Sequence, residues 1–375
     1  MKPRRLVAAN GVFFPVAAAY AALALPASVF SMSGALAVLP GLASPAGHAH
    51  EMLFGFALAV VAGNQLGPAD PLRLAVMLGL WALARAGFLV APHGTASAVA
   101  NVAFAALLAA LLAPRLLGAA KKLRNQALPL TLVAICVSAG AFPLAPQATL
   151  GVAVLLFALL MLFMGGRIIA PAVAGQFYRQ GAVLDARVQP RTEGGLIVSM
   201  ALAVAAAALP ATVGLTMLSG AATAAAGLLA AVRLTRWRLW ALRGRPDLLC
   251  LAAGYAWLAL GLLLYGAALA AGREQTAALH VITVGGLGTL TLNVMAMTSL
   301  LRARQDPARA RIPVWGTALI GVAAAARVLA GVDIPAAQVV LGCAAVFWSA
   351  AFALLFGLLV RAKRNFRRSD PLNDA

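Results

Sequence analysis

The chain has 375 residues, of which 63% are hydrophobic and 10% charged, with a mean hydropathy of +0.93 and a formal net charge of +19. Soluble globular proteins carry about 25% charged residues, so this composition excludes a soluble enzyme, a soluble nucleic-acid-binding protein and a disordered chain. It indicates an integral membrane protein that crosses the bilayer several times.

Apolar runs long enough to cross a bilayer follow one another along the whole chain. A spanning helix needs about 20 apolar residues, and these runs are rich in Ala and Leu, without the alternation typical of an outer-membrane β-barrel. We therefore predict an all-α helical membrane bundle of about twelve transmembrane helices, forming a single integral membrane domain over residues 1–375. The predicted spans lie near residues 11–31, 48–66, 72–91, 97–117, 127–143, 148–170, 194–211, 213–232, 248–271, 278–300, 313–331 and 336–360.

Lys and Arg residues concentrate at both termini and in alternate links between these spans. Cytoplasmic loops of membrane proteins carry such an excess of positive charge, so the net charge indicates topology rather than a nucleic-acid partner. Of the links predicted on the opposite side, only the one between the ninth and tenth spans holds a basic residue, Arg273. This pattern predicts cytoplasmic N- and C-termini. The basic start followed by an apolar run also resembles a cleaved signal peptide, whose removal would leave the other spans in the same orientation.

The predicted topology brings all four histidines to one side of the membrane. His48 and His50 lie at the outer end of the second span, His280 at the outer end of the tenth, and His93 in an outer link. Imidazole is a common ligand of haem iron and copper, and helical bundles build cofactor sites from facing helices. His48, His50 and His280 are therefore candidate metal or haem ligands, with interfacial hydrogen bonding as the alternative. His93 is expected to be an ordinary exposed residue.

The acid beside these histidines is a second candidate functional group. Glu51 is the only acidic residue predicted inside a span, where an ionisable group indicates function. At about 100° per residue, His48 and His50 point about 160° apart on a regular helix, so they cannot share one metal, whereas His48 and Glu51 share a face. Glu51 could orient a metal-bound imidazole or carry protons.

Two arginines fall within predicted spans, where a charge is costly unless it reaches the interface or finds a partner. These are Arg85 and Arg327. Arg85 could face Glu51 or a haem propionate, and extension of either side chain to the membrane interface is the alternative.

Four segments, in order and with the expected spacing, resemble the NnrS family. Gly47-His48-Ala49-His50-Glu51-Met52-Leu53-Phe54-Gly55-Phe56 resembles the family's second-helix signature. Residues 165–169 resemble its Gly-Gly-Arg segment, residues 254–258 its ninth-span pattern, and residues 278–289 its His-Ala-Leu-Thr-Val-Gly segment. The resemblance extends over most of the chain.

The resemblance implies a bacterial inner-membrane protein of twelve helices that binds haem and copper and is associated with nitric oxide tolerance and denitrification. Carried over residue by residue, it makes His48, His50 and His280 candidate metal or haem ligands and Glu51 a supporting acid. Arg167 matches the family's arginine, without an assigned role.

Two departures from the family pattern fall at the predicted cytoplasmic ends of the second and tenth spans. The chain reads Asn64-Gln65-Leu66-Gly67-Pro68 where the family carries Asn-Trp-Thr-Gly, and residues 296–304 lack the histidine of a Gly-His-Thr-Gly stretch. We interpret the chain as a divergent member that keeps an outer cofactor cluster and lacks an inner one.

Two hypotheses about function follow from the sequence. The first is a haem- or copper-binding membrane protein of the nitric oxide response, with His48 or His50 and His280 as ligands. The alternative is a multi-pass secondary transporter that uses Glu51 and the histidines as a proton relay. Four histidines are fewer than the six that haem-copper oxidases use, and the sequence leaves catalytic turnover open.

Overall fold

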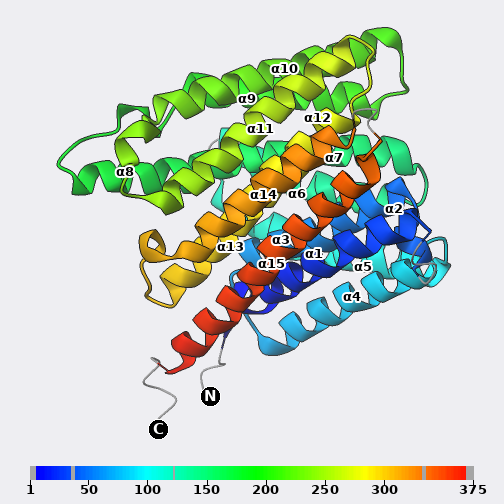
Figure 1. Ribbon diagram of the computed structural model, residues 1–375, viewed down its shortest axis with the longest axis horizontal. Helices are drawn as coiled ribbons and strands as arrows, with labels where there is room; N and C mark the ends of the chain where they lie inside the picture. The colour runs from blue at the N-terminus through cyan, green and yellow to red at the C-terminus, as the bar shows by residue number, and fades with distance from the viewer. Residues whose placement is uncertain (1–5, 35–38, 121–122, 332–334, 369–375) are drawn as a thin grey trace.

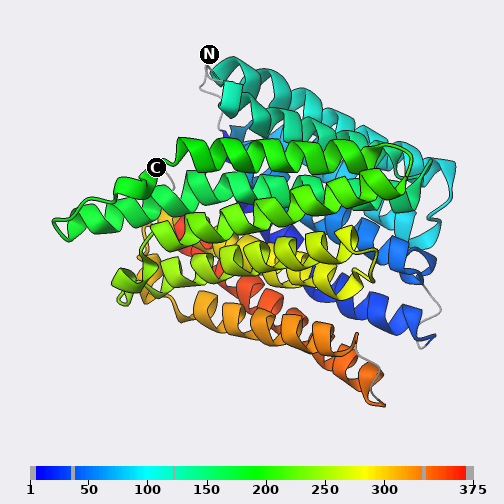
Figure 2. The same cartoon turned by 90° about the horizontal axis from the view of Figure 1, so that it is seen from above.

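The protein is a bundle of long helices, shown by a computed structural model that describes residues 6–34, 39–120, 123–331 and 335–368. Figures 1 and 2 show the helices lying side by side along one general direction. In the part of the chain described, β-structure is limited to β1 (Val7–Ala8) and β2 (Pro68–Ala69), which pair antiparallel. Lys2, Arg4, Arg5, Lys121 and Lys122, which the charge argument used, lie outside the described residues.

The elements follow the apolar runs of the sequence. In chain order they are α1 (Asn10–Met32), η1 (Pro40–Leu42), α2 (Pro45–His50), η2 (Glu51–Ala57), α3 (Leu58–Gln65), α4 (Pro71–Val90), α5 (Thr95–Ala119), α6 (Leu123–Ala141), α7 (Pro146–Met164), η3 (Gly165–Ile169), α8 (Ala170–Arg179), η4 (Asp185–Arg187), α9 (Pro190–Ala208), α10 (Val213–Arg236), η5 (Leu239–Leu242), α11 (Pro246–Ala270), α12 (Thr276–His280), η6 (Val281–Gly288), α13 (Thr289–Arg302), η7 (Pro307–Arg309), α14 (Arg311–Leu329) and α15 (Ala337–Arg368).

Ten of the described helices are long and apolar enough to cross a membrane. The prediction of an all-α, multi-pass membrane protein is therefore confirmed, and ten of the twelve predicted spans coincide with these helices. The other two predicted spans, near residues 48–66 and 127–143, correspond to the continuous segment α2-η2-α3 and to α6, which is a shorter apolar helix.

Two helices extend well beyond their predicted spans. Helix α15 ends at Arg368, whereas its predicted span ended near residue 360. Segments α7, η3 and α8 form one continuous helix over Pro146–Arg179, whereas the sequence predicted a span near 148–170 followed by a link. The continuing residues of α8 are mostly small or apolar, and Val173 and Phe177 are buried against the rest of the protein. Hydropathy therefore does not mark where the helix ends.

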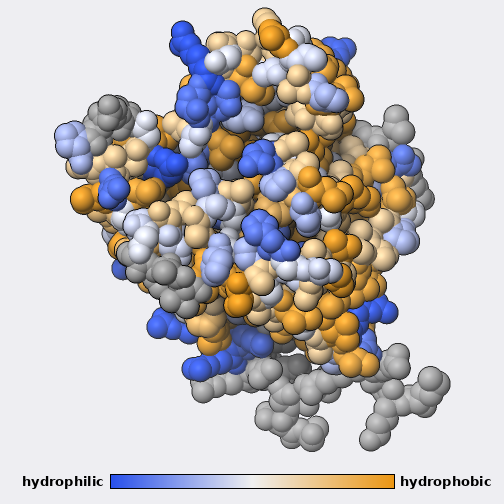
Figure 3. All heavy atoms as spheres, turned by 90° about the vertical axis from the view of Figure 1, so that its right-hand side faces the viewer, coloured by the Kyte–Doolittle hydropathy of each residue, from blue (hydrophilic) through white to orange (hydrophobic). Residues whose placement is uncertain are grey.

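The two ends of the bundle differ in what they carry. At one end α1 ends and α2 and α12 lie close to the surface; we call this the histidine end because it holds His48, His50 and His280 (Figure 1). Figure 3 views this end and shows hydrophilic patches among hydrophobic residues. At the opposite end α1 begins and α15 ends; we call this the arginine end because it holds Arg167, Arg187 and Arg233.

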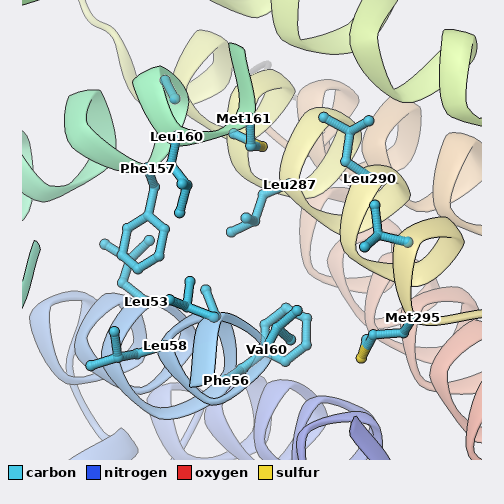
Figure 4. Close-up of a cluster of buried hydrophobic side chains, with 14 of the residues drawn as sticks. Leu53, Phe56, Leu58, Val60, Phe157, Leu160, Met161, Leu287, Leu290 and Met295 are labelled. Carbon is cyan, nitrogen blue, oxygen red and sulfur yellow. The ribbon is translucent and has the colours of Figure 1, made fainter. Parts of the chain in front are cut away.

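The bundle core is built around α1, the α2-α3 segment, α7 and α13. In Figure 4, Leu53 and Phe56 of η2, Phe157 of α7 and Leu287 of η6 project into one hydrophobic cluster, and all four side chains are buried. The first helix is part of this interior. Phe13 and Phe14 have no exposed surface, and the Trp348 indole Nε1 on α15 donates to the Ala21 carbonyl on α1 at 3.0 Å.

Candidate functional site

A buried charged network lies inside the bundle near the histidine end, with the Glu51 carboxylate at its centre. Glu51 has no exposed surface. Its Oε1 accepts a hydrogen bond from the Arg85 guanidinium at 2.5 Å and another from the His50 ring Nδ1 at 2.8 Å, and its Oε2 accepts from the Tyr20 hydroxyl. Three donors on one carboxylate stabilise its ionised form, because each bond is charge-assisted.

The network continues from Arg85 to a further helix. The second terminal nitrogen of Arg85 donates to the Asn101 side-chain oxygen on α5, and the Asn101 amide in turn donates to the Ser97 carbonyl at 2.9 Å. Helices α1, α4 and α5 and the α2-η2 segment are thereby held together by polar contacts in an apolar interior. The predicted pairing of Arg85 with Glu51 is confirmed, and extension of Arg85 to the interface is wrong for this residue, whose exposed fraction is 3%.

A glycine of the second-helix signature makes room for this network. A Cβ atom at Gly55 would lie 3.0 Å from a Tyr20 ring carbon and 3.1 Å from both the Arg85 guanidinium and the Glu51 carboxylate. The Gly55 carbonyl also accepts a hydrogen bond from the Trp81 indole at 2.9 Å. The segment of residues 47–56 therefore supplies both the acid, Glu51, and, through Gly55, the space in which Tyr20 and Arg85 contact it.

His50 is enclosed by aromatic rings. Its imidazole stacks on Phe88, with ring centroids 3.8 Å apart and planes 13° apart, and also contacts Phe54 and Phe142 at centroid distances of 5.3 and 4.4 Å. Because the Glu51 carboxylate can only accept, Nδ1 of His50 carries the proton. The Nε2 lone pair of His50 therefore points away from Glu51, within this aromatic surround.

His48 and His280 form a second, separate group. The imidazoles of His48 and His280 interact electrostatically with one another, and Arg327 on α14 interacts electrostatically with both. His280 Nδ1 is 2.6 Å from the Thr276 carbonyl, and His48 Nδ1 is 2.9 Å from the Ser28 hydroxyl on α1. Helices α1, α2, α12 and α14 thus contribute to one group of polar residues at the histidine end.

The hydrogen bonds of this pair fix which ring nitrogen is free. A carbonyl oxygen only accepts, so His280 Nδ1 donates to Thr276. The Ser28 hydroxyl donates to the Leu42 carbonyl at 3.4 Å, so it accepts from His48. In each neutral ring Nε2 then carries the lone pair, which is the tautomer that ligates a metal through Nε2. Neither Nε2 has a hydrogen-bond partner among the described residues.

The expected sharing of faces along α2 is only partly right. His48 and His50 face different surroundings, as a regular helix requires, but Glu51 bonds to His50 and not to His48. The physical reason is that the helix changes to a π-helix at Glu51, so the 100° spacing no longer applies from that residue onward. His93 lies in the exposed α4–α5 connection, as predicted.

Three π-helical segments coincide with three of the four family-like motifs. Segment η2 directly follows His50, η3 covers the Gly-Gly-Arg motif, and η6 directly follows His280. Such segments are rare and concentrate at functional sites. An apolar pocket of about 60 Å³ lies among them, lined by Ala57, Ile169 and Leu287 together with the thioether side chains of Met161 and Met164. Met161 and Leu287 face one another across this region in Figure 4.

The described residues contain no group of three or more His, Cys, Asp or Glu side chains placed to hold a metal ion. At the histidine end, the described residues that carry imidazoles are His48, His50, His93 and His280. The sequence missed Tyr20 and Asn101, because a neutral polar side chain within an apolar run carries no sign of its partner. The sequence signal that could have found them is that each is a polar residue inside a predicted apolar span, 11–31 for Tyr20 and 97–117 for Asn101.

Comparison with known proteins identifies one family. The model of the family described as NnrS protein matches residues 11–362, nearly the whole chain. No curated protein matches it.

Proposed function

The chain belongs to the NnrS family, and from that membership we propose that it is an integral membrane protein that binds haem or copper in the nitric oxide or denitrification response, with His48 and His280 as ligands. The observation that carries this proposal is that two imidazoles at one end of the bundle interact electrostatically, with both Nδ1 atoms engaged in hydrogen bonds, to the Ser28 hydroxyl and the Thr276 carbonyl.

These residues fit copper or haem iron by the chemistry of their donor atoms. Both metals accept neutral imidazole nitrogen, and a hydrogen bond from the other ring nitrogen to a protein oxygen is the usual support of a metal-bound histidine. The nearby Arg327 provides a positive charge for an anionic group, such as a propionate, bound beside the two rings. A metal held there would supply the position at which a nitrogen oxide binds.

His50 and Glu51 receive a supporting role in this proposal. His50 is 1% exposed and packed among three phenylalanine rings, so it is the less accessible of the three candidate ligands. Its bond to Glu51, and the bonds of Glu51 to Arg85 and Tyr20, hold α2 against α1 and α4 and so fix the position of His48. No observation on the described residues favours the transporter alternative, since both Glu51 oxygens are already engaged.

We extend the proposal to topology. Segment α2-η2-α3 and helix α6 would complete twelve spans in the bacterial inner membrane, with both termini cytoplasmic. This orientation places the arginine end at the cytoplasmic face, as the positive-inside rule requires. Helix α1 would be the first of these spans, and it packs against α15 through Trp348 and Ser349.

The ligands are tested by single replacements of the two histidines. In protein expressed with ample haem and copper and purified in detergent, His48→Ala and His280→Ala are each expected to lower bound metal at least about tenfold, because a site with few ligands loses one. Metal analysis and the absorption spectrum measure this loss. His93→Ala, which removes an exposed imidazole near the same end, is the matched control and should retain wild-type content. Full metal content in both test variants would refute the assignment.

The hydrogen bond to His48 gives a second test. Ser28→Ala removes the acceptor for His48 Nδ1 and is expected to weaken metal binding by about 10–100-fold without removing a ligand. Competition against a chelator of known affinity measures the change. Ser33→Ala is the control, because Ser33 lies at the same end of α1 and, among the described residues, its hydroxyl bonds to the Phe30 carbonyl and not to a histidine. Equal affinities for the two variants would contradict a role for Ser28.

A further inference from the structure

The arginine end contains a pocket that the proposed cofactor site does not use. Its volume is about 230 Å³, and it lies between the end of α7, segment η3, the start of α9 and the end of α10. Its polar lining comprises Arg167, Arg187, Arg233, Glu193 and Asn125. Three arginines against one glutamate give it a positive charge.

Arg233 forms the floor of this pocket and is held in place. Its exposed fraction is 3%, and its terminal nitrogens donate to the Leu162 carbonyl at 3.1 Å and to Glu193 Oε1 at 2.8 Å. Its guanidinium carbon also lies 5.5 Å from the Trp237 ring centroid. A Cβ atom at Gly166 would come within 2.2 Å of this guanidinium, so the glycine beside Arg167 is what allows Arg233 to lie across η3.

The guanidinium groups of the other two arginines are accessible to a ligand. Arg167 and Arg187 are exposed at the rim, and within the described residues neither forms a hydrogen bond or an ion pair. Guanidinium groups offer planar pairs of N–H donors that match the oxygens of phosphate and carboxylate. Two such groups beside one pocket favour an anionic ligand with several oxygens.

A membrane-spanning α7 that begins at one boundary of the bilayer would bring the pocket to the head-group region of the other leaflet. Arg167 follows the start of α7 by a helical rise of about 30 Å, which equals the thickness of the hydrocarbon core of a bilayer. On the side toward the bundle interior the pocket is lined by Leu159, Leu162 and Leu196. The pocket therefore combines a cationic rim with an apolar wall, as the site of a lipid head group at the membrane interface requires.

We propose that this pocket binds a phosphate group, carried by the head group of an anionic phospholipid or by a soluble phosphate-type anion. Arg167 and Arg187 contact the phosphate oxygens, and Arg233, fixed by Glu193 and Leu162, supplies a buried positive charge beneath them. The proposal gives Arg167 a role in ligand binding, and it is independent of the metal site at the opposite end.

The test uses the full-length protein purified in detergent and two probes, one for each source of phosphate. Inorganic phosphate, added at constant ionic strength against chloride, tests the soluble anion through the midpoint of thermal unfolding. Phosphatidylglycerol, compared with phosphatidylcholine of the same acyl chains, tests the lipid through retention in native mass spectrometry. Wild-type protein is expected to bind at least one probe, and the double variant Arg167→Gln/Arg187→Gln to bind that probe at least tenfold more weakly.

Arg191→Gln is the matched control, because Arg191 is exposed on the same side of the protein, near the start of α9, and does not line the pocket. If the double variant proves unstable, Arg187→Gln alone, in the short η4 segment, replaces it with the same expected direction. A phosphate-dependent shift lost in the variant identifies a soluble anion, and preferential phosphatidylglycerol retention lost in the variant identifies a lipid. Binding of neither probe by the wild type, or an equal loss in the Arg191 control, overturns the proposal.

Discussion

Replacing Glu51 by glutamine is expected to destabilise the protein by about 3–5 kcal/mol, because it leaves the buried Arg85 guanidinium without a counter-charge. Both side chains are almost completely inaccessible, with exposed fractions of 4% and 0% for the Arg85 and Glu51 side chains. Replacing Arg85 by methionine is expected to cost a similar amount for the complementary reason. Unfolding in mixed micelles of a mild detergent and dodecyl sulfate measures the change.

The double variant Glu51→Gln/Arg85→Met separates the charge effect from loss of packing. The double variant removes both charges. Its free energy of unfolding is therefore expected to be well above the wild-type value minus the sum of the two single-variant losses. Arg191→Gln, an exposed arginine, should change stability little. Additive losses in the double variant would show that the two charges do not stabilise one another in the membrane interior.

Replacing Gly220 by alanine is expected to destabilise the pair formed by α10 and α11 by about 2–3 kcal/mol, the cost of overpacking a tight contact. A Cβ atom there would lie 2.4 Å from the Ala270 backbone nitrogen and 2.7 Å from the Gly266 carbonyl. Backbone atoms cannot rotate away, so the helices must separate. Small residues at such contacts are what allow membrane helices to approach closely.

A second glycine on the same helix provides the control for this prediction. A Cβ atom at Gly214 meets no atom within 4 Å, and alanine favours a helix over glycine by up to about 1 kcal/mol. Gly214→Ala should therefore be neutral or stabilising while Gly220→Ala is destabilising, as measured by the midpoint of thermal unfolding in detergent. The same sign for both variants would contradict the close backbone contact.

The helical bundle could be predicted from the sequence because a helix that spans a lipid bilayer requires a long run of apolar residues. Twenty or so apolar residues in a row have few other stable structures in a membrane, and the predicted spans match the observed helices to within a few residues at most ends. The continuation of α7 through η3 into α8 was missed, because Val173 and Phe177 of α8 are buried by packing against other parts of the protein, which hydropathy does not record. The π-helices were missed as well, since they add no residue type that hydropathy could detect.

The candidate site was predicted less completely, and the reason differs from residue to residue. The pairing of Arg85 with Glu51 followed from the cost of burying either charge alone. The placement of the histidines near one end followed from counting spans. Which imidazole meets which partner depends on how helices rotate against one another, and no pattern within a single helix records that rotation. Glu51 therefore turned out to bond to His50, whereas His48 lies near His280 and Ser28.

An absorption spectrum of the detergent-purified wild-type protein, with metal analysis of the same sample, tests whether the protein binds haem or copper as proposed for His48 and His280. Expression with ample haem and copper precedes the measurement, and spectra are recorded oxidised, reduced and after addition of nitric oxide. We expect the purified protein to contain bound metal and, for haem, to show a Soret band that shifts on reduction and on adding nitric oxide. A folded protein that is colourless and free of both metals would contradict the proposal.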